Sequence, residues 1–373
     1  MKKFFTKFFV MFLIVSLIPV STTTLAYSNI KSMNVNARAA IAIDKDTGLV
    51  LYEKNAYEVI PMASTTKIMT ALVAIRHGDL DKKITISKRA AAIRGSTVKY
   101  RVGEEITLRE LLYGLMFKSG NDAALAIAEG VGGSVEEFIK LMNEEAVNIG
   151  LSNTHFETPH GLDKPTHYTT AYDLALLTAE AKKNNIFDEI VKSKTISRGQ
   201  HKFTRDYNNI NKLLYSNPQC TGVKTGYTGQ AGKCLVSSFK LNNNEIIVVT
   251  LNCTERWKES NKIYDYVKNN YTYDKIRNKN DSVFTFVDLK GKKVNGVIKE
   301  EVTLPKDNSS KYEEKIEIYK DNFKDKYIKS NSVIGYYKIY KNEKEIYKTF
   351  IYNDNSINNQ ETIFYKLKQY IKR

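Results

Sequence analysis

Three short motifs in a fixed order carry side chains that could catalyse acyl transfer. They are Ser64-Thr65-Thr66-Lys67, Ser119-Gly120-Asn121 and Lys224-Thr225-Gly226. These match the S-x-x-K, S-x-N and K-T-G elements of active-site serine enzymes. Together they would supply a nucleophile with its base, a proton shuttle and an anion-binding strand. No single motif is specific, since further S-x-x-K matches begin at Ser28, Ser96 and Ser237.

The local sequence separates Ser64 from the other matches. Pro61 stands shortly before it, which is typical of a helix start. Lys67 comes about one helical turn after Ser64, so its side chain returns over the same face. The sequence therefore predicts Ser64 as the nucleophile and Lys67 as its base. The apolar series with helical period that follows consists of Ile68, Met69, Leu72, Val73 and Ile75.

The elements that would position these motifs change along the chain from strands to helices and back to strands. Residues 38–54 alternate and turn like a hairpin. Residues 106–185 carry helical signals, including capping boxes that begin at Thr107 and Ser134. The pattern predicts an α/β (α+β) fold, in which an inserted helical subdomain faces an antiparallel sheet across a cleft. The predicted closing elements are strands at 223–227, 235–239 and 246–251 and a helix at 260–267.

The first 26 residues have the features of a secretory signal peptide. Three lysines among the first seven residues form the positive region, residues 8–20 form the apolar core, and residues 24–26 form a small-x-small cleavage site. The apolar core is short for a membrane span, which needs roughly 20 residues, and an uncleaved anchor is the alternative. We therefore expect an exported, extracytoplasmic protein, secreted or attached to the outer face of the cell membrane.

The C-terminal part of the chain differs in composition. Residues 280–357 consist of short β-rich runs separated by polar clusters, which predicts a small β-rich domain. Residues 358–373 predict an amphipathic basic helix; its stretch 360–373 could lie on a membrane surface or pack on the β-rich domain. The net charge of +16 favours an anionic partner in the cell envelope. No nucleic-acid motif accompanies this charge, so no nucleic-acid partner is expected.

The cysteines and histidines indicate neither a disulfide framework nor a metal site. Cys220, Cys234 and Cys253 are too few for such a framework. A pair between Cys234 and Cys253 is conceivable, but free buried thiols are the favoured interpretation. The five histidines are scattered without metal-ligand spacing. We therefore expect no metal and no cofactor.

Residues 38–275 resemble the low-molecular-mass penicillin-binding proteins, the serine D-Ala-D-Ala carboxypeptidases. The three motifs carry the resemblance, together with Pro159-His160-Gly161-Leu162-Asp163 and with His167-Tyr168 and the segment 171–175 after it. It implies a β-lactamase/transpeptidase-like domain over 34–275, with the β-rich domain and terminal helix following. The implied activity removes the terminal D-alanine from peptidoglycan stem peptides, a step of cell-wall biogenesis that affects cell shape. The resemblance also implies acylation by penicillins and other β-lactam antibiotics.

The chemistry assigns catalytic roles to four residues. Ser64 would attack the carbonyl between the two D-alanines, after Lys67 takes its proton. Burial and the nearby cation of Lys224 would lower the pKa of Lys67 enough for this. Ser119 would pass a proton to the departing amine, and Asn121 would position the substrate or Lys67.

Further residues would bind the substrate. The backbone amides of Ser64 and Tyr227 would form the oxyanion hole, the second by resemblance, and Gly226 would let the substrate backbone approach. The substrate ends in a free carboxylate, which needs cationic and hydroxyl partners. The candidates for that role are Lys224, Thr225, Thr228 and, by resemblance, Arg256.

Three other functions remain as alternatives. A β-lactamase would need a carboxylate that activates water, and Glu157 is the candidate in the matching stretch. An endopeptidase or transpeptidase would act on peptidoglycan crosslinks with the same motifs. A wall-binding protein without activity would be expected to lack Ser64, Lys67 or Lys224, and none is missing. His160 is interpreted as structural, orienting the loop beside the cleft.

Overall fold

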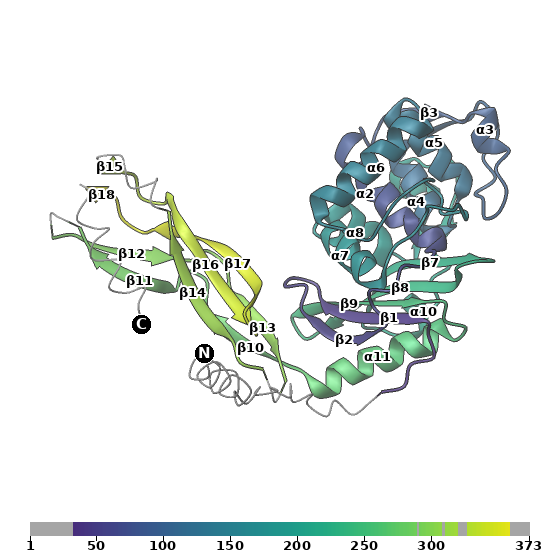
Figure 1. The fold of residues 1–373 in the computed structure, drawn as a ribbon. Coiled ribbons are helices and arrows are strands. Elements are labelled where there is room, and N and C mark those ends of the chain that lie inside the picture. The colour runs from purple at the N-terminus through teal and green to yellow at the C-terminus, as the bar shows by residue number, and fades with distance from the viewer. Residues whose placement is uncertain (1–32, 289–290, 308–309, 320–326, 359–373) are drawn as a thin grey trace, which may run out of the picture. The chain divides into compact units, whose positions relative to one another are not determined.

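The structure is a computed structural model that describes residues 33–288, 291–307, 310–319 and 327–358 (Figure 1). The predicted signal peptide lies outside these residues, as does the predicted C-terminal helix apart from its first residue. Within the described ranges, no helix combines the length and apolar character needed to cross a membrane.

A five-stranded antiparallel sheet organises the N-terminal domain, with the strand order β2-β1-β9-β8-β7. The predicted hairpin and meander are both present, and β1 pairs with β9, so that Ile41 lies opposite Val249. All residues of β1 are buried because helices cover both faces of the sheet (Figure 1). The strands are β1 (Ala39–Asp44), β2 (Val50–Lys54), β7 (Cys220–Thr228), β8 (Gly232–Leu241) and β9 (Asn244–Leu251).

The helical subdomain lies between β2 and β7 in the chain and packs on one face of the sheet. Helix α11 (Arg256–Asn270) packs on the other face against β8 and β9, and begins four residues before the predicted start. The main helices of the subdomain are α2 (Lys67–His77), α4 (Leu108–Phe117), α5 (Asn121–Gly132), α6 (Val135–Ile149), α7 (Ala171–Lys182) and α8 (Asn185–Lys192). The shorter elements are η2 (Ala63–Thr66), β3 (Lys83–Thr85), α3 (Lys88–Ala91), β4 (Glu105–Thr107), β5 (Thr195–Ile196), α9 (Arg198–His201), β6 (Tyr207–Asn208) and α10 (Leu213–Ser216).

Both predicted N-caps are present, but neither glutamate completes its predicted capping box; the Glu137 carboxylate accepts from Lys140 Nζ at 2.6 Å. The side chains of Thr107 and Ser134 accept hydrogen bonds from the third residue of the helix that each precedes, as N-caps do. The Glu110 carboxylate, however, accepts from the hydroxyls of Thr204 (2.6 Å) and Tyr207 (2.7 Å). A buried carboxylate needs strong donors, and these come from a distant segment that packs on α4.

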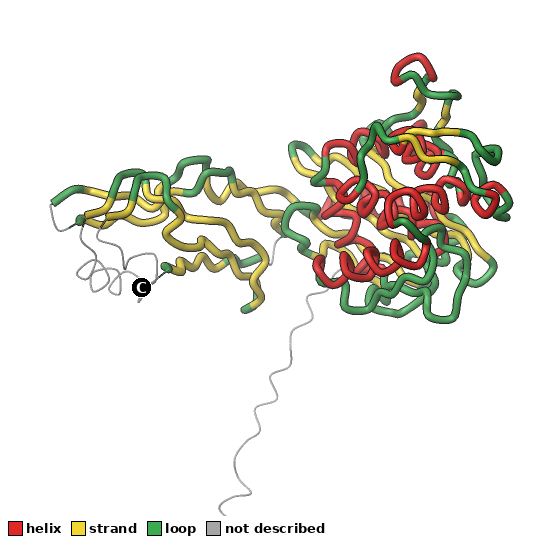
Figure 2. Tube along the Cα trace, turned by 90° about the horizontal axis from the view of Figure 1, so that it is seen from above, coloured by secondary structure: helices red, strands yellow, loops and turns green. Residues whose placement is uncertain are grey.

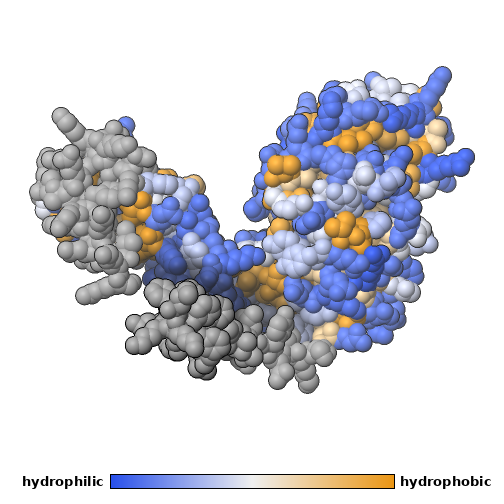
Figure 3. Space-filling view, viewed as in Figure 1, coloured by the Kyte–Doolittle hydropathy of each residue, from blue (hydrophilic) through white to orange (hydrophobic). Residues whose placement is uncertain are grey.

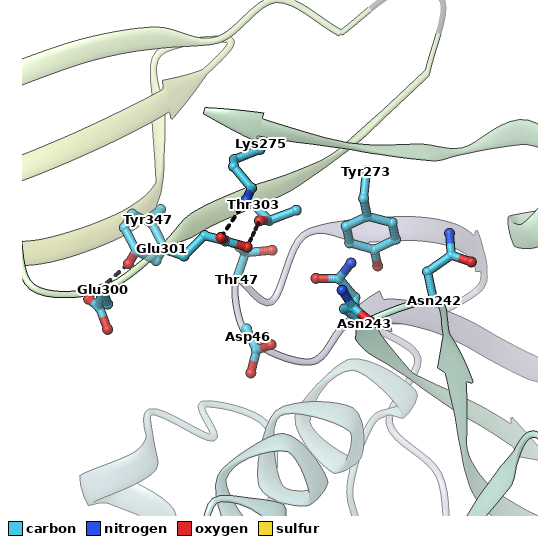
Figure 4. Close-up of a pocket in the computed structure, with 11 residues that line it drawn as sticks. Asp46, Thr47, Asn242, Asn243, Tyr273, Lys275, Glu300, Glu301, Thr303 and Tyr347 are labelled. Carbon is cyan, nitrogen blue, oxygen red and sulfur yellow. Dashed lines mark hydrogen bonds and ion pairs between the residues drawn. The ribbon is translucent and has the colours of Figure 1, made fainter. Parts of the chain in front are cut away.

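The residues after α11 form a β-rich domain with its own apolar core, which includes Val294, Leu304, Ile334 and Ile351. The described part of this domain consists of strands and loops, and the described helices belong to the N-terminal domain (Figure 2). Figure 4 shows Lys275 and Thr303 directed at the Glu301 carboxylate, with the Lys275–Glu301 ion pair at 2.7 Å. The strands are β10 (Thr272–Arg277), β11 (Ser282–Val287), β12 (Lys293–Val297), β13 (Val302–Lys306), β14 (Glu313–Ile318), β15 (Tyr327–Ile328), β16 (Val333–Lys341), β17 (Lys344–Asn353) and β18 (Ile357–Asn358). The predicted fold class is therefore confirmed, apart from the terminal helix.

The three cysteines are free and buried, as favoured from the sequence. Burial raises the pKa of each thiol, at Cys220, Cys234 and Cys253, to about 11. Thiols of this kind are protonated at neutral pH and unreactive. The visible surface of the N-terminal domain is mainly hydrophilic, with apolar residues in separate patches (Figure 3).

Candidate active site

Ser64 lies in a single 3-10 turn, η2, that runs directly into helix α2 at Lys67. This geometry brings Lys67 Nζ to 3.0 Å from Ser64 Oγ. Ala63, the residue before Ser64, adopts a left-handed conformation with φ of 51°. A residue with a side chain adopts this conformation at a cost of about 1–2 kcal/mol, so the surrounding contacts must hold it in place.

Three neighbours fix the amine of Lys67, which is fully buried. Besides Ser64 Oγ, Nζ contacts Asn121 Oδ1 at 2.8 Å and the backbone oxygen of His160 at 2.6 Å. The Asn121 amide is itself oriented, because its Nδ2 donates to the Arg94 carbonyl at 2.7 Å. A neutral amine has two N–H donors and one lone pair. Asn121 Oδ1 and the His160 carbonyl can only accept, so in the neutral form they would take the two N–H groups and the lone pair would face the Ser64 hydroxyl; a protonated amine would donate to all three oxygens.

The electrostatics of the site favour this neutral form. Burial, followed by the charge of Lys224, holds the pKa of Lys67 well below its usual range, while the Asp122 carboxylate opposes the shift. Burial, followed by the Arg256 guanidinium, lowers the pKa of Lys224 to about 7. Among the described residues, the printed contacts of the two amines are with the oxygens of Ser64 and Asn121 and the carbonyls of His160 and Thr225. These oxygens are uncharged, so the site favours the unprotonated form of Lys67.

The K-T-G motif lies on β7, at the edge of the sheet and against the Ser64 turn. A Cβ atom on Gly226 would lie 3.1 Å from Ala63 Cβ and 3.2 Å from the Ser64 amide nitrogen. A side chain at this position would therefore crowd the nucleophile. The edge position leaves the Tyr227 segment accessible, and the Tyr227 side chain is 67% exposed.

The S-x-N motif occupies the start of helix α5, as the sequence predicts. Ser119 is buried, has a left-handed φ of 58° and precedes the helix, which begins at Asn121. The next residue, Asp122, accepts hydrogen bonds from the backbone amides of Val98 (3.0 Å), Lys99 (2.9 Å) and Tyr100 (3.2 Å). Asp122 thus ties a distant loop to the motif. No role was predicted for Asp122 from the sequence, where the one signal was an acidic residue directly after S-x-N.

The predicted carboxylate-binding residues differ in how they are engaged. Lys224 Nζ donates to the Thr225 carbonyl at 2.9 Å, and both side chains are buried at the K-T-G strand. The Thr228 hydroxyl donates to Asp163 Oδ1 at 2.7 Å. Arg256 Nη1 donates to the carbonyls of Gly226 (2.6 Å) and Cys234 (3.1 Å). Arg256 Nε is buried without a hydrogen-bond partner among the described residues.

His160 and Glu157 lie in the loop that borders the cleft. Burial lowers the pKa of His160 to about 3, with Lys67 the next cause, and its Nδ1 accepts from the Leu162 amide at 3.2 Å. The side chain therefore organises the loop, and its backbone oxygen contacts Lys67. The Glu157 carboxylate instead accepts from the Thr166 amide at 2.9 Å. This engagement disfavours Glu157 as the water-activating base of a β-lactamase.

In the described part of the chain, no group of three or more histidine, cysteine, aspartate or glutamate residues could hold a metal ion. The arrangement that the fold does supply is a serine in contact with a buried lysine, Lys67, whose pKa is lowered, and a second buried lysine, Lys224. Such a set is suited to nucleophilic acyl transfer.

The fold and the site define a serine enzyme of the β-lactamase/transpeptidase-like class. The chain belongs to the D-alanyl-D-alanine carboxypeptidase family, whose family model matches residues 26–255. A second model, described as the penicillin-binding protein 5 C-terminal domain, matches residues 271–359.

Individual relatives agree with this membership. D-alanyl-D-alanine carboxypeptidase DacF of Bacillus subtilis is 38% identical over 268 residues, which cover 69% of this chain and 68% of that protein. The structure of penicillin binding protein 5 from Haemophilus influenzae is similar with a TM-score of 0.71 at 26% identity, covering 88% of this chain and 99% of that one. The Streptomyces K15 DD-transpeptidase structure is similar with a TM-score of 0.59 at 35% identity, and the match covers 63% of this chain and 98% of that one.

Proposed function

We propose that this protein is an exported serine D-Ala-D-Ala carboxypeptidase that removes the terminal D-alanine from peptidoglycan stem peptides. The observation that carries the proposal is the contact of 3.0 Å between Lys67 Nζ and Ser64 Oγ, at an amine whose other neighbours are two acceptors. The carboxypeptidase names of its relatives support the same substrate.

In the acylation step, Ser64 Oγ attacks the carbonyl carbon of the penultimate D-alanine, and Lys67 takes the hydroxyl proton. The tetrahedral oxyanion accepts hydrogen bonds from the backbone amides of Ser64 and Tyr227. The C–N bond then breaks, and the proton returns through Ser119 to the departing D-alanine amine. Water hydrolyses the resulting ester, which frees Ser64 and releases the shortened peptide.

The preference for a C-terminal residue follows from charge. A substrate carboxylate beside Lys224 would give that lysine a negatively charged partner and would favour its protonated form. Thr225 is adjacent, and the Arg256 guanidinium, whose Nη1 donates to the Gly226 carbonyl, adds positive charge at the same strand. Penicillins carry a carboxylate and a reactive amide carbonyl, so they would acylate Ser64 by the same route.

A transpeptidase or endopeptidase is the second candidate, because the similar Streptomyces K15 structure is titled a DD-transpeptidase. A transpeptidase would use an amine of another stem peptide in place of water as the acyl acceptor, whereas an endopeptidase would use water and release the amine of a crosslinked peptide. The two activities share the acyl-enzyme and differ in its fate, so the products distinguish them.

The location is part of the proposal. The signal-peptide features of residues 1–26 support export. The amphipathic pattern of residues 360–373 supports attachment to the outer face of the cell membrane. Fractionation of cells, with and without residues 360–373, would test both. A full-length protein that stays in the cytoplasm would contradict export.

The main test is intact-mass spectrometry of the protein without residues 1–26, mixed with a penicillin and followed over time beside Ser64→Ala. The expected result is a long-lived adduct that is absent from the variant. The same enzyme given a pentapeptide ending in D-Ala-D-Ala should release D-alanine. Absence of both reactions in folded protein would overturn the proposal, and rapid penicillin turnover without an adduct would favour a β-lactamase.

A further inference from the structure

The loop from residue 157 to residue 167 forms a wall of the site and touches Lys67 through the His160 carbonyl. Gly161 in this loop has a positive φ of 85°, and any Cβ atom there would collide with the Ala63 carbonyl oxygen. The loop is also tied to helix α2, because the Thr70 hydroxyl donates to the Pro159 carbonyl at 2.6 Å. The loop and the Ser64 turn are therefore packed directly against each other.

His167, at the end of this loop, is buried and joins the two segments by hydrogen bonds. Its Nδ1 lies 3.0 Å from the backbone nitrogen of Glu157, and its Nε2 lies 2.8 Å from Thr66 Oγ1. The Glu157 backbone N–H can only donate, so Nδ1 must accept. In a neutral imidazole the proton is then on Nε2 and is donated to Thr66 Oγ1.

The Thr66 hydroxyl passes the connection on to the residue before the nucleophile. Since it accepts from His167, its own hydrogen is free to donate to the Ala63 carbonyl, which lies 2.8 Å away. Ala63 is the residue with the left-handed φ, and its peptide continues into the Ser64 amide of the proposed oxyanion hole. The chain of bonds thus runs from Glu157 through His167 and Thr66 to the nucleophile turn.

We propose that His167 is a positioning residue for acylation: it ties the 157–167 loop to the Ser64 turn, and so holds both the strained Ala63 peptide and the His160 carbonyl in place. The inference rests on the proposed function, because acylation is the step that it supports. Burial lowers the pKa of His167 to about 4, consistent with the neutral ring that the hydrogen bonds require. The charged or titratable groups near it are Glu157, His155, Asp163 and Lys67.

Two substitutions separate the two ring contacts. In His167→Asn the side-chain oxygen can replace Nδ1 and accept from Glu157, but nothing reaches Thr66. In His167→Gln the amide nitrogen can replace Nε2 and still donate to Thr66. Thr66→Val removes the hydroxyl from the other side of the same bond. His155→Asn is the matched control, since His155 lies in the neighbouring segment and contacts the Thr166 carbonyl rather than the nucleophile turn.

The experiment measures the acylation rate constant and the dissociation constant of a penicillin separately, per active site counted from the adduct mass. We expect His167→Asn and Thr66→Val each to lower the rate constant roughly 10- to 100-fold with little change in the dissociation constant, because misplacement of reacting groups affects the transition state. The double variant should lose little more than either single variant. His167→Gln should keep most of the rate, and His155→Asn all of it.

A merely structural role would reduce the fraction of active sites or the melting temperature and leave the rate per site unchanged. That result, or additive losses in the double variant, would overturn the inference. The nitrogen chemical shifts of His167 provide a readout that does not depend on activity: a neutral ring with the proton on Nε2 is expected. A charged ring or the opposite tautomer at pH 7 would overturn the inference even if no variant were acylated. Failure of the wild-type protein to be acylated would instead count against the proposed function.

Discussion

Asn121 Oδ1 lies 2.8 Å from Lys67 Nζ and thereby joins the second motif to the first. The amide cannot turn freely, because Nδ2 donates to the Arg94 carbonyl. Asn121 therefore presents an uncharged acceptor to a buried base. An uncharged acceptor orients the amine without favouring its protonated form, which is what a base near neutral pH requires.

Replacement of Asn121 by aspartate should impair acylation through charge. A carboxylate in contact with Lys67 would raise the pKa of that amine by about 1–3 pH units. At a pH below the Lys67 pKa of both the wild type and the variant, the fraction of neutral Lys67 should fall roughly 10- to 1000-fold. The acylation rate should fall with it. The acid limb of the rate against pH should move to higher pH by the same amount. A profile that is lowered uniformly, without that movement, would contradict the electrostatic explanation.

The opposite change is expected for Asp122→Asn. Burial and the charge of Lys224 lower the pKa of Lys67, and the Asp122 charge raises it. Removal of the Asp122 charge should therefore move the acid limb of the acylation rate to lower pH. The side-chain oxygen that remains can still accept from the backbone amides of residues 98–100. Asp122→Ala should in addition lower the melting temperature, because the buried Tyr100 amide loses its acceptor, at a cost of about 1–3 kcal/mol for an unsatisfied buried group. Acylation profiles and thermal unfolding of both variants test these expectations.

Gly226→Ala should reduce acylation at least 10-fold, since the added Cβ would lie within 3.2 Å of the Ser64 amide nitrogen and would crowd the oxyanion site. Gly229→Ala is the matched control three residues away, where an added Cβ meets no atom within 4 Å. Acylation rates of the two variants are to be compared at equal active-site concentration. Equal rates would contradict the prediction, because they would mean that the Ser64 turn shifts to accommodate the extra methyl group without loss of acylation.

Lys224→Met should alter stability in a pH-dependent way. The folded-state pKa of Lys224, about 7, lies below that of an unfolded lysine, so the unfolded state binds more protons between these values. The buried Lys224 therefore destabilises the folded wild-type protein below about pH 7. This destabilisation decreases as the pH rises from about 7 to about 10, so the free energy of unfolding increases over that range. Removing the amine should stabilise the protein by the order of a few kcal/mol at pH 6 and by less at pH 9. Denaturant unfolding at the two pH values measures the difference, and an equal effect at both would contradict it.

The amino-acid sequence was sufficient to predict the main elements and to propose residues for the chemistry. Ser64, Lys67, Ser119 and Lys224 were proposed because each lies in a short motif whose spacing has a local meaning, such as one helical turn. The hairpin, the meander and the helix caps at Thr107 and Ser134 follow from local patterns of the same kind. The C-terminal β-rich domain was predicted from its short alternating runs.

Contacts between distant segments could not be predicted in this way. The Lys67 amine is oriented by the His160 carbonyl, Thr228 is engaged by Asp163, and Glu110 accepts from Tyr207 instead of completing a local cap. Each of these partners is far away in sequence, and a hydrogen bond between two ordinary polar residues leaves no periodic signal.

The sequence by itself therefore determined which groups are present and on which elements they lie. Only the tertiary structure decided which groups meet, how each amine and amide is oriented, and which side chains are buried. Burial and proximity govern the charge state of Lys67 and Lys224, because both depend on the removal of water and on distances set by packing. The same packing holds the left-handed Ala63 in place, a conformation that its residue type would not favour.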